Sequence, residues 1–291
     1  MKMKEQVSME HNFIYSEFNK KFEISYKKEK AHFPMPPHTH NAIEIYLNLT
    51  DIPSVLLGNS MLSLQKNVLM IVPPYCVHQI TPIEDGIYER YILTISSNWL
   101  DNLIGDSCAE EFEYLRNANM PAHIHLSEEE KAEIIKKMEL FIKCDEKQFF
   151  LKTSLFADVM EQIHKKALSA SGKMENPSLN ELSDTAKTVS EILDYINENL
   201  YENICIEDIA NHVFLNHDYI NRVFRKHLNT SIRHYITIQR ITRSQQLLLE
   251  GYSVSQIQEM VGYGSYEHFF KTFKKITGLT PKEYRNQILG E

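Results

Sequence analysis

The sequence contains few cysteines, and their spacing matches neither a disulfide framework nor a metal-binding motif. Its 291 residues include four, Cys76, Cys108, Cys144 and Cys205, and no two form a Cys-x-x-Cys pair. This usage predicts neither a disulfide framework nor a zinc finger. A reducing cytoplasm is the compartment that it favours.

Long apolar segments are also missing. No run of about 18 apolar residues occurs, so no membrane span is expected. Met1–Glu10 is polar and charged, and it lacks the apolar core of a secretory signal. We therefore expect a cytoplasmic protein with no membrane partner.

Basic residues are fewer than acidic ones, 31 against 39, which gives a net charge of −8. Taken alone, this excess argues against a nucleic-acid partner. The charge is unevenly distributed, however. Residues 203–291 contain 11 Lys or Arg and 8 Asp or Glu, so that segment is +3 and the remainder is −11. The acidic average therefore belongs to the first two thirds of the chain, and the length favours two domains.

The N-terminal part has the pattern of short strands. Val55–Leu57 and Met61–Leu64 flank Gly58-Asn59, a two-residue hairpin signal, and the apolar run Val68–Val72 ends at Pro73-Pro74. Close spacing of such strands favours an all-β sandwich or barrel. We assign residues 1–126 to this unit.

Two amphipathic helices are expected over residues 127–170. Ser127 is a candidate N-cap before three glutamates. The apolar face of the first helix is predicted to comprise Ala132, Ile135, Met138 and Ile142. This helical hairpin could serve as a dimerisation element or pack against the strands. Residues 171–184, rich in Ser and Asn, are predicted to form a linker, and residues 185–291 an all-α domain.

A weak repeat occurs in the C-terminal segment, at about 206–227 and 254–276. Each copy has a short helix, a tight turn, a capping residue (Asn216 or Ser265) and a longer helix that ends in basic residues. This is the sequence form of a helix-turn-helix, whose second helix can lie in the DNA major groove. The intervening helix, about Ile232 to Glu250, would span roughly 28 Å. Two recognition helices could then lie about one DNA turn apart, roughly 34 Å.

Residues from about 188 to 288 resemble the DNA-binding domain of AraC/XylS-type transcription regulators. The segment Gly262–Arg285, with Gly-Tyr, Phe-Phe-Lys, Gly-Leu-Thr-Pro and Tyr-Arg, carries most of the likeness, and Tyr235, Arg240 and Leu247-Leu248 match the linker helix. The pattern departs from the family at Phe214 and Asn229, both usually glycine, and at Gln258, usually alanine.

The resemblance implies which side chains face DNA. By position in the motif these are Asn216, Asp218, Asn221, Arg222, Arg225, Lys226, Ser265, Tyr266, Glu267, Phe270, Lys271 and Lys274. Arginine suits guanine, asparagine suits adenine, and a glutamate can accept from cytosine. The alternative for each residue is a solvated surface side chain.

The N-terminal part resembles a cupin barrel over about residues 20–96. Pro-Pro-His-Thr-His at 36–40, Glu44, and Pro-Pro followed by His78 match its two short motifs. In metal cupins such residues form the ligand set, and imidazole with carboxylate suits Zn, Mn, Fe or Ni. If His40, Glu44 and Tyr46 face inward, Ile43, Ile45 and Leu47 face away.

We expect a polar effector site at His38, His40, Glu44, Tyr46 and His78. A bound metal and a purely structural role are the alternatives, and no metal is assigned. The expected fold is therefore multidomain, an all-β cupin-like barrel with a helical hairpin followed by an all-α domain with two helix-turn-helix units.

The predicted function is sequence-specific DNA binding by a transcription regulator that responds to an effector, with no enzymatic activity. The expected partners are double-stranded DNA, a small-molecule effector and a second copy of the chain, and RNA polymerase is a possible fourth. Two alternatives come from other classes. One is a metal-dependent cupin enzyme fused to a DNA-binding domain, and the other is a DNA-binding dimer that needs no effector.

Overall fold

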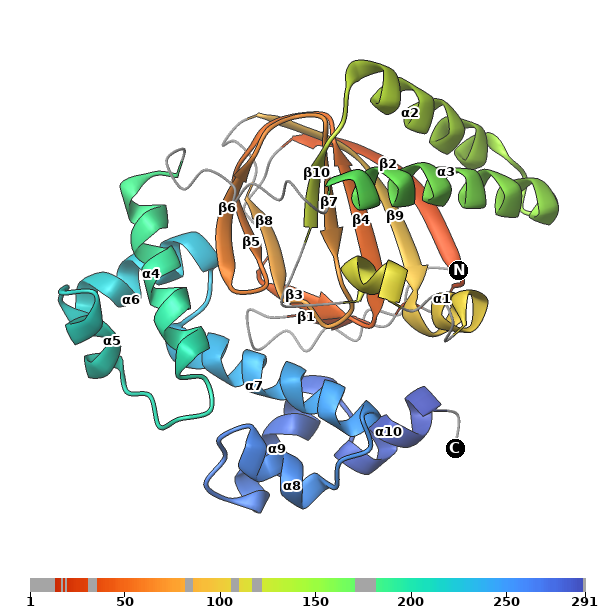
Figure 1. Ribbon diagram of the computed structural model, residues 1–291. Helices are drawn as coiled ribbons and strands as arrows, with labels where there is room; N and C mark the ends of the chain where they lie inside the picture. Colours follow the sequence, from red (N-terminus) through yellow and green to blue (C-terminus); the bar gives the residue numbers. More distant parts are fainter. Residues whose placement is uncertain are drawn as a thin grey trace.

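The chain forms an N-terminal β-rich unit and a C-terminal helical unit (Figure 1). The computed structural model describes residues 14–16, 18, 20–30, 36–81, 86–105, 110–116, 122–170 and 182–289. Most of the linker predicted at 171–184 lies outside these residues. Its last residue, Asp184, is already the first residue of a helix.

The strands of the described residues form two five-stranded sheets. In spatial order, the first contains β1 (Ile14–Ser16), β3 (His38–His40), β8 (His78–Thr81), β5 (Ile52–Leu57) and β6 (Ser60–Leu64). The second contains β10 (Ala122–His125), β7 (Val68–Val72), β4 (Ala42–Asn48), β9 (Ile87–Ser96) and β2 (Phe22–Lys30). No described strand of one sheet pairs with the other. The unit predicted as a sandwich or cupin-like barrel therefore consists of two sheets, as far as the described residues go.

Side-chain alternation along β4 separates an apolar face from a polar one. Ile43, Ile45 and Leu47 are buried in a cluster with the helices that cover this sheet. Tyr46 lies on the opposite face, in a second cluster to which both sheets contribute. The arrangement with Glu44 and Tyr46 facing the other sheet is therefore the one observed.

Among the described residues, three α-helices accompany the sheets, α1 (Ser97–Ile104), α2 (Glu128–Lys143) and α3 (Phe149–Ala170), together with a short 3-10 helix at Glu110–Leu115. The predicted cap at Ser127 is confirmed, because its side chain accepts from the Glu130 amide while Glu130 accepts from the Ser127 amide. Helices α2 and α3 lie side by side across the second sheet (Figure 1). They complete the cluster that buries the apolar face of β4.

The predicted apolar face of α2 is wrong in its details. The structure buries Ile134, Met138 and Phe141, whereas Ile142 is exposed. The helix carries apolar residues on two overlapping faces, each with spacings of three and four residues. The sequence alone is therefore compatible with burial of either face. Packing decides between them, since the Phe141 ring lies 5.9 Å from the ring of Phe22 on β2.

Seven helices of the described chain form the C-terminal unit. They are α4 (Asp184–Glu198), α5 (Ile206–His212), α6 (His217–Leu228), α7 (Ile232–Leu249), α8 (Val254–Met260), α9 (Tyr266–Thr277) and α10 (Pro281–Leu289). Most begin at a side-chain cap, as at Asn216, Ser231 and Ser265. The long helix expected from Ile232 is confirmed as α7.

Helix α7 joins two apolar cores. Its first half contributes Ile232, Tyr235 and Ile238 to a cluster with α4, α5 and α6. Its second half contributes residues from Ile241 onward to a cluster with α8, α9 and α10. Each helix-turn-helix unit therefore has its own core, and α7 connects the two.

Candidate DNA-binding face and effector site

The first helix-turn-helix unit comprises α5 and α6. Its turn passes through Phe214, which has a φ of 53° and a side chain that is 93% exposed. Asn216 then caps α6, since its Oδ1 accepts from the Asp218 amide at 2.8 Å. Ile220 and Phe224 are buried toward the core, which leaves the opposite face of α6 to solvent.

This free face of α6 lines a groove of about 710 Å³. Five predicted DNA contacts line it together with Ile206 and Ser231: Asp218, Asn221, Arg222, Arg225 and Lys226. The three cations at one surface suit a polyanion. Asp218 contacts His217 at 3.0 Å, and the Arg222 guanidinium lies 5.3 Å from the centre of the Tyr219 ring.

The second unit comprises α8 and α9. Ser265 caps α9 by accepting from the His268 amide. Tyr266 is exposed and its ring is 6.0 Å from that of Phe270, which is partly buried. Lys271 pairs with Glu267 at 2.6 Å, and Lys274 is exposed. The predicted contacts of this unit therefore form one face, on which the Lys271–Glu267 pair offsets part of the positive charge.

The departures from the family pattern are accommodated locally. Asn229 ends α6 with a φ of 50°, a conformation that asparagine tolerates. Gln258, in place of a small residue, lies at the end of α8, where its side-chain amide donates to the carbonyl of Tyr263. It therefore closes the turn before α9 and does not insert between the helices.

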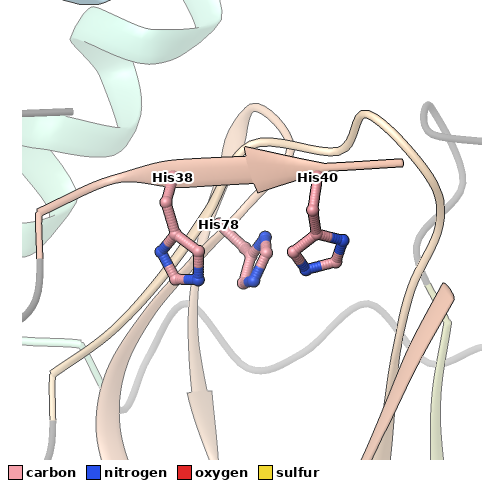
Figure 2. Close-up of side chains that lie close together, drawn as sticks. All are labelled: His38, His40 and His78. Atoms are coloured by element: carbon pink, nitrogen blue, oxygen red, sulfur yellow. The ribbon is translucent and has the colours of Figure 1, made fainter. Parts of the chain in front are cut away.

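The five predicted effector residues are brought together in the β-rich unit. His38 and His40 lie on β3 and His78 lies on β8 (Figure 2), while Glu44 and Tyr46 lie on β4. One ligand nitrogen from each histidine lies within 4.8 Å of the others. His78 and His40 are buried, at 0% and 5% exposed, whereas His38 and Glu44 are half-buried.

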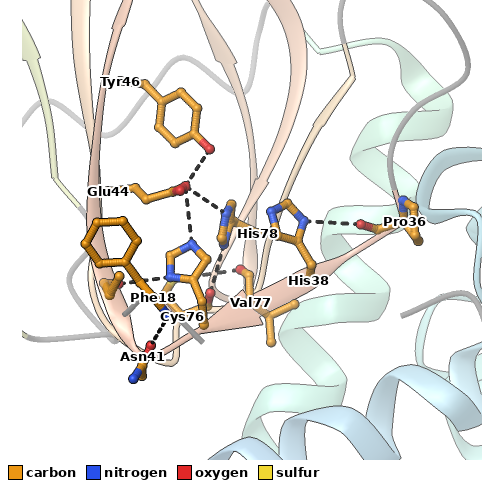
Figure 3. A network of polar contacts seen from close by, with 11 residues as sticks. Phe18, Pro36, His38, Asn41, Glu44, Tyr46, Cys76, Val77 and His78 are labelled. Atoms are coloured by element: carbon orange, nitrogen blue, oxygen red, sulfur yellow. Dashed lines mark hydrogen bonds and ion pairs between the residues drawn. The ribbon is translucent and has the colours of Figure 1, made fainter. Parts of the chain in front are cut away.

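Glu44 is the polar centre of the cluster. Its Oε2 lies 3.2 Å from His40 Nε2 and 3.6 Å from His78 Nε2, and it accepts from the Tyr46 hydroxyl at 2.5 Å (Figure 3). Backbone carbonyls orient the rings: Nδ1 of His40 is 3.0 Å from the Ala42 oxygen, and Nδ1 of His78 is 3.0 Å from the Cys76 oxygen. This leaves the Nε2 atoms directed at Glu44.

The pKa values of His38 and His40 shift in opposite directions. Burial, together with the charges of His78 and His40, lowers the pKa of His38 well below its usual value. Burial also disfavours protonated His40, but the charge of Glu44 and its hydrogen bond raise the pKa of His40. Although burial opposes ionisation, His40 and His78 hold the pKa of Glu44 well below its usual range. An ionised Glu44 therefore faces a readily protonated His40.

A buried arginine on the same inner face was missed from the sequence. Arg90 on β9 donates to Glu29 at 2.6 Å, and its guanidinium lies 4.0 Å from the centre of the Tyr88 ring. The i, i+2 spacing of Tyr88 and Arg90 on a strand could have identified it. Tyr88 in turn donates to Asn48, so polar groups continue along β4 beyond Glu44 and Tyr46.

The two units contact each other beside the histidine cluster. Tyr235 on α7 donates to the carbonyl of Gly58 at 3.1 Å, and Asn59 contacts both Gln239 at 3.0 Å and Asn197 at 2.7 Å. The predicted hairpin turn between β5 and β6 therefore lies against α4 and α7.

A second contact starts from the loop between β7 and β8. Tyr75 donates its amide to the carbonyl of His40 at 2.8 Å, and its hydroxyl accepts from that of Tyr284 on α10 at 3.2 Å. One residue thus touches both the histidine cluster and the C-terminal unit. The sequence does not predict this contact, because it depends on how the two units are placed.

Comparison with known proteins identifies the C-terminal part. Residues 209–287 match a family described as a helix-turn-helix domain. The chain is 24% identical over 164 residues to the regulatory protein PocR of Salmonella typhimurium strain LT2, and this match covers 54% of each chain. It is 35% identical over 98 residues to the melibiose operon regulatory protein of Escherichia coli strain K12, covering 33% of this chain and 32% of that one.

A solved structure of ToxT from Vibrio cholerae covers 91% of this chain and 98% of its own, at 16% identity and a TM-score of 0.35. At that score the likeness carries no weight for fold or function.

The C-terminal part of the chain is a helix-turn-helix DNA-binding domain. It is of the AraC type, as the motifs from Gly262 to Arg285 predicted.

The chain spans about half the length of PocR and about a third of the melibiose regulator, so neither relative fixes the activity of the whole protein. Within the described part of the chain, no helix combines the length and the hydropathy of a membrane span.

Proposed function

We propose that this protein is a sequence-specific DNA-binding transcription regulator whose β-rich unit, a cupin-like domain, binds an effector. The observation that carries the proposal is the pair of helix-turn-helix units on one helix, α7, each with an exposed face of polar and basic residues. The relatives with this domain have names of regulators, and we assign no catalytic residue.

Genome-wide mapping of DNA bound by the full chain tests this function. We expect enrichment at discrete sites near the start of genes, and loss of most of it in Arg222→Ala. Arg243→Ala, which removes an arginine paired with Glu250 on α7, is the matched control. A wild-type chain without enriched sites would contradict the proposal.

The effector site is proposed at His38, His40, Glu44, Tyr46 and His78. Its support is the buried concentration of imidazole and carboxylate groups around Glu44. A ligand here can change DNA binding only if it binds two arrangements of the units with different affinity. The Tyr75 loop, which touches both His40 and Tyr284, and the Gly58-Asn59 turn are the contacts that would differ between those arrangements.

Asn59→Ala tests this coupling, because it removes side-chain bonds to both α4 and α7. We expect a severalfold change in the DNA affinity of the ligand-free chain. Asn102→Ala, an exposed asparagine whose described bond stays within α1, is the control. If Asn59→Ala and the wild type bind DNA with equal affinity, the Gly58-Asn59 turn does not couple the two units.

The pH behaviour of His40 tests the electrostatics of the site. Its raised pKa contributes stability that is present below the usual histidine value of 6.5 and is lost as pH rises through the raised value. Glu44→Gln removes the charge that opposes burial, so the pKa of His40 should fall below 6.5. Imidazole signals followed by NMR measure this. A pKa that stays above 6.5 in the variant would rule out Glu44 as the cause.

A divalent transition metal ion is a second candidate for the ligand. The residues fit, because three imidazole nitrogens converge within 4.8 Å and Glu44 adds an adjacent carboxylate. Such an ion would supply a Lewis-acidic centre when bound. Calorimetric titration with Zn²⁺ and Ni²⁺ tests the fit: stoichiometric binding lost in His78→Ala supports it, and no binding by the wild type excludes these ions.

A homodimer is proposed through the end of the α2–α3 hairpin. Leu140, Phe149, Phe150 and Leu151 are exposed there, and Phe150 is 87% exposed. Sedimentation of Phe150→Asp should give a lighter species than the wild type, with Leu103→Asp on α1 as the control for another exposed apolar residue. A wild-type monomer would end this proposal. Contact with RNA polymerase stays a prediction.

A further inference from the structure

Arg240, at the middle of α7, binds backbone from both helix-turn-helix units. Its Nε donates to the carbonyl of Leu200 at 2.8 Å, and its Nη2 donates to that of Glu202 at 2.6 Å. Both carbonyls belong to the loop that leads from α4 into the first unit. Its Nη1 donates at 2.9 Å to the carbonyl of Gly262, in the turn of the second unit. The three bonds use the guanidinium as a fork.

The same two segments also touch directly. A Cβ placed on Gly262 would come 2.4 Å from the carbonyl oxygen of Tyr201, so the turn of the second unit rests against the loop of the first. Arg240 lies between Ile238, in the first core, and Ile241, in the second. It therefore lies at the boundary between the two buried clusters, and Ile276 on α9 packs against both of them.

We propose that Arg240 is a positioning residue that fixes the distance and rotation between α6 and α9, so that the protein binds two half-sites at one spacing. This rests on the proposed DNA-binding function. Along DNA, one additional base pair moves the second half-site by about 3.4 Å and rotates it by roughly 34°. Because the second unit follows α7 through the short turn at 250–253, the bond to Gly262 restrains it from a second side.

A lysine cannot replace this group, because a single ammonium on a flexible stem cannot present a planar fork to three carbonyls. Arg240→Lys should therefore weaken the restraint while keeping the charge, and Arg240→Ala should remove it. Arg243→Ala is the matched control, since Arg243 lies one turn further along α7 and bonds only to side chains, Gln246 and Glu250, among the described residues.

Selection of bound duplexes from a randomised DNA library, by the full chain and each variant, tests the proposal. The wild type and Arg243→Ala should select two sequence blocks at a single spacing. Arg240→Ala should select the same blocks at several spacings, and Arg240→Lys an intermediate spread. On the wild-type duplex Arg240→Ala should bind about tenfold more weakly, while a duplex with one block should bind both chains equally.

The outcomes that overturn the proposal are distinct from failure of the DNA-binding function. A single unchanged spacing in Arg240→Ala, or equal loss of affinity for one-block and two-block duplexes, shows that Arg240 has a merely structural role. If Arg240→Ala does not fold, an unchanged spacing in Arg240→Lys decides the same way. A wild type that selects one block overturns the positioning role but keeps DNA binding, and a wild type that selects no DNA ends both.

Discussion

The two helix-turn-helix units have turns with the same left-handed backbone but different surroundings. Phe214 occupies this conformation in the first unit at a φ of 53°, and Gly262 occupies it in the second at 72°. The Phe214 side chain is 93% exposed, whereas Gly262 packs against the carbonyl of Tyr201. The turn of the first unit faces solvent, and that of the second lies at the boundary between the units.

This difference explains why only one turn keeps glycine. A left-handed conformation costs an L-residue roughly 1–2 kcal/mol, which the first unit can bear because nothing crowds the side chain. In the second unit any Cβ would also collide with backbone that cannot rotate away. Whether a glycine of the family pattern can be replaced therefore depends on the atoms that surround its position.

Gly262→Ala should give the largest effect. Backbone strain and the collision with Tyr201 together should destabilise the C-terminal unit by about 3 kcal/mol, measured by chemical denaturation. Gly251→Ala is the control, because Gly251 has a φ of 93° with nothing within 4 Å of its added Cβ. It should cost about 1 kcal/mol, from conformation alone. Equal losses in the two variants would show that the contact with Tyr201 is unimportant.

The DNA-facing residues of the units should differ next. Arg222→Ala should cost about 1–3 kcal/mol on the selected duplex and little on random DNA, because we propose that its guanidinium contacts base edges. Lys271→Ala should weaken both duplexes alike by a smaller amount, since Lys271 is paired with Glu267 and we propose that it contacts phosphate and not a base edge. Anisotropy titrations at two salt concentrations measure this. An equal loss of affinity for random and selected DNA in Arg222→Ala would contradict the proposed contact between Arg222 and a base.

The smallest expected effect is a gain. Phe214→Gly should stabilise the first unit by about 0.5 kcal/mol, because relief of the left-handed strain slightly exceeds the entropy cost of glycine. Thermal unfolding beside Phe214→Ala, which keeps the Cβ and should show no gain, checks it. A loss larger than that of Gly251→Ala would mean that the Phe214 ring makes a stabilising contact.

Much of the local structure was predictable, because its causes are local. The caps at Ser127, Asn216 and Ser265 follow from residue type and from the helical pattern after them. The meeting of His38, His40 and His78 with Glu44 was expected from the resemblance to cupin motifs. Alternation along β4 then placed Glu44 and Tyr46 on one face.

Contacts between distant segments could not be predicted. The buried face of α2 was misassigned because its sequence allows two apolar faces, and contact with Phe22 selects one of them. The Tyr75–Tyr284 contact and the three bonds of Arg240 depend on the placement of whole units. No periodicity in a single segment encodes such placement.

Hydroxyl-radical footprinting of the full chain on its selected duplex tests most directly that both units bind DNA from one rigid domain. We expect two protected segments on the same face of the duplex, separated by about one helical turn, roughly 10 base pairs. A single protected segment, or two segments on opposite faces, would contradict it.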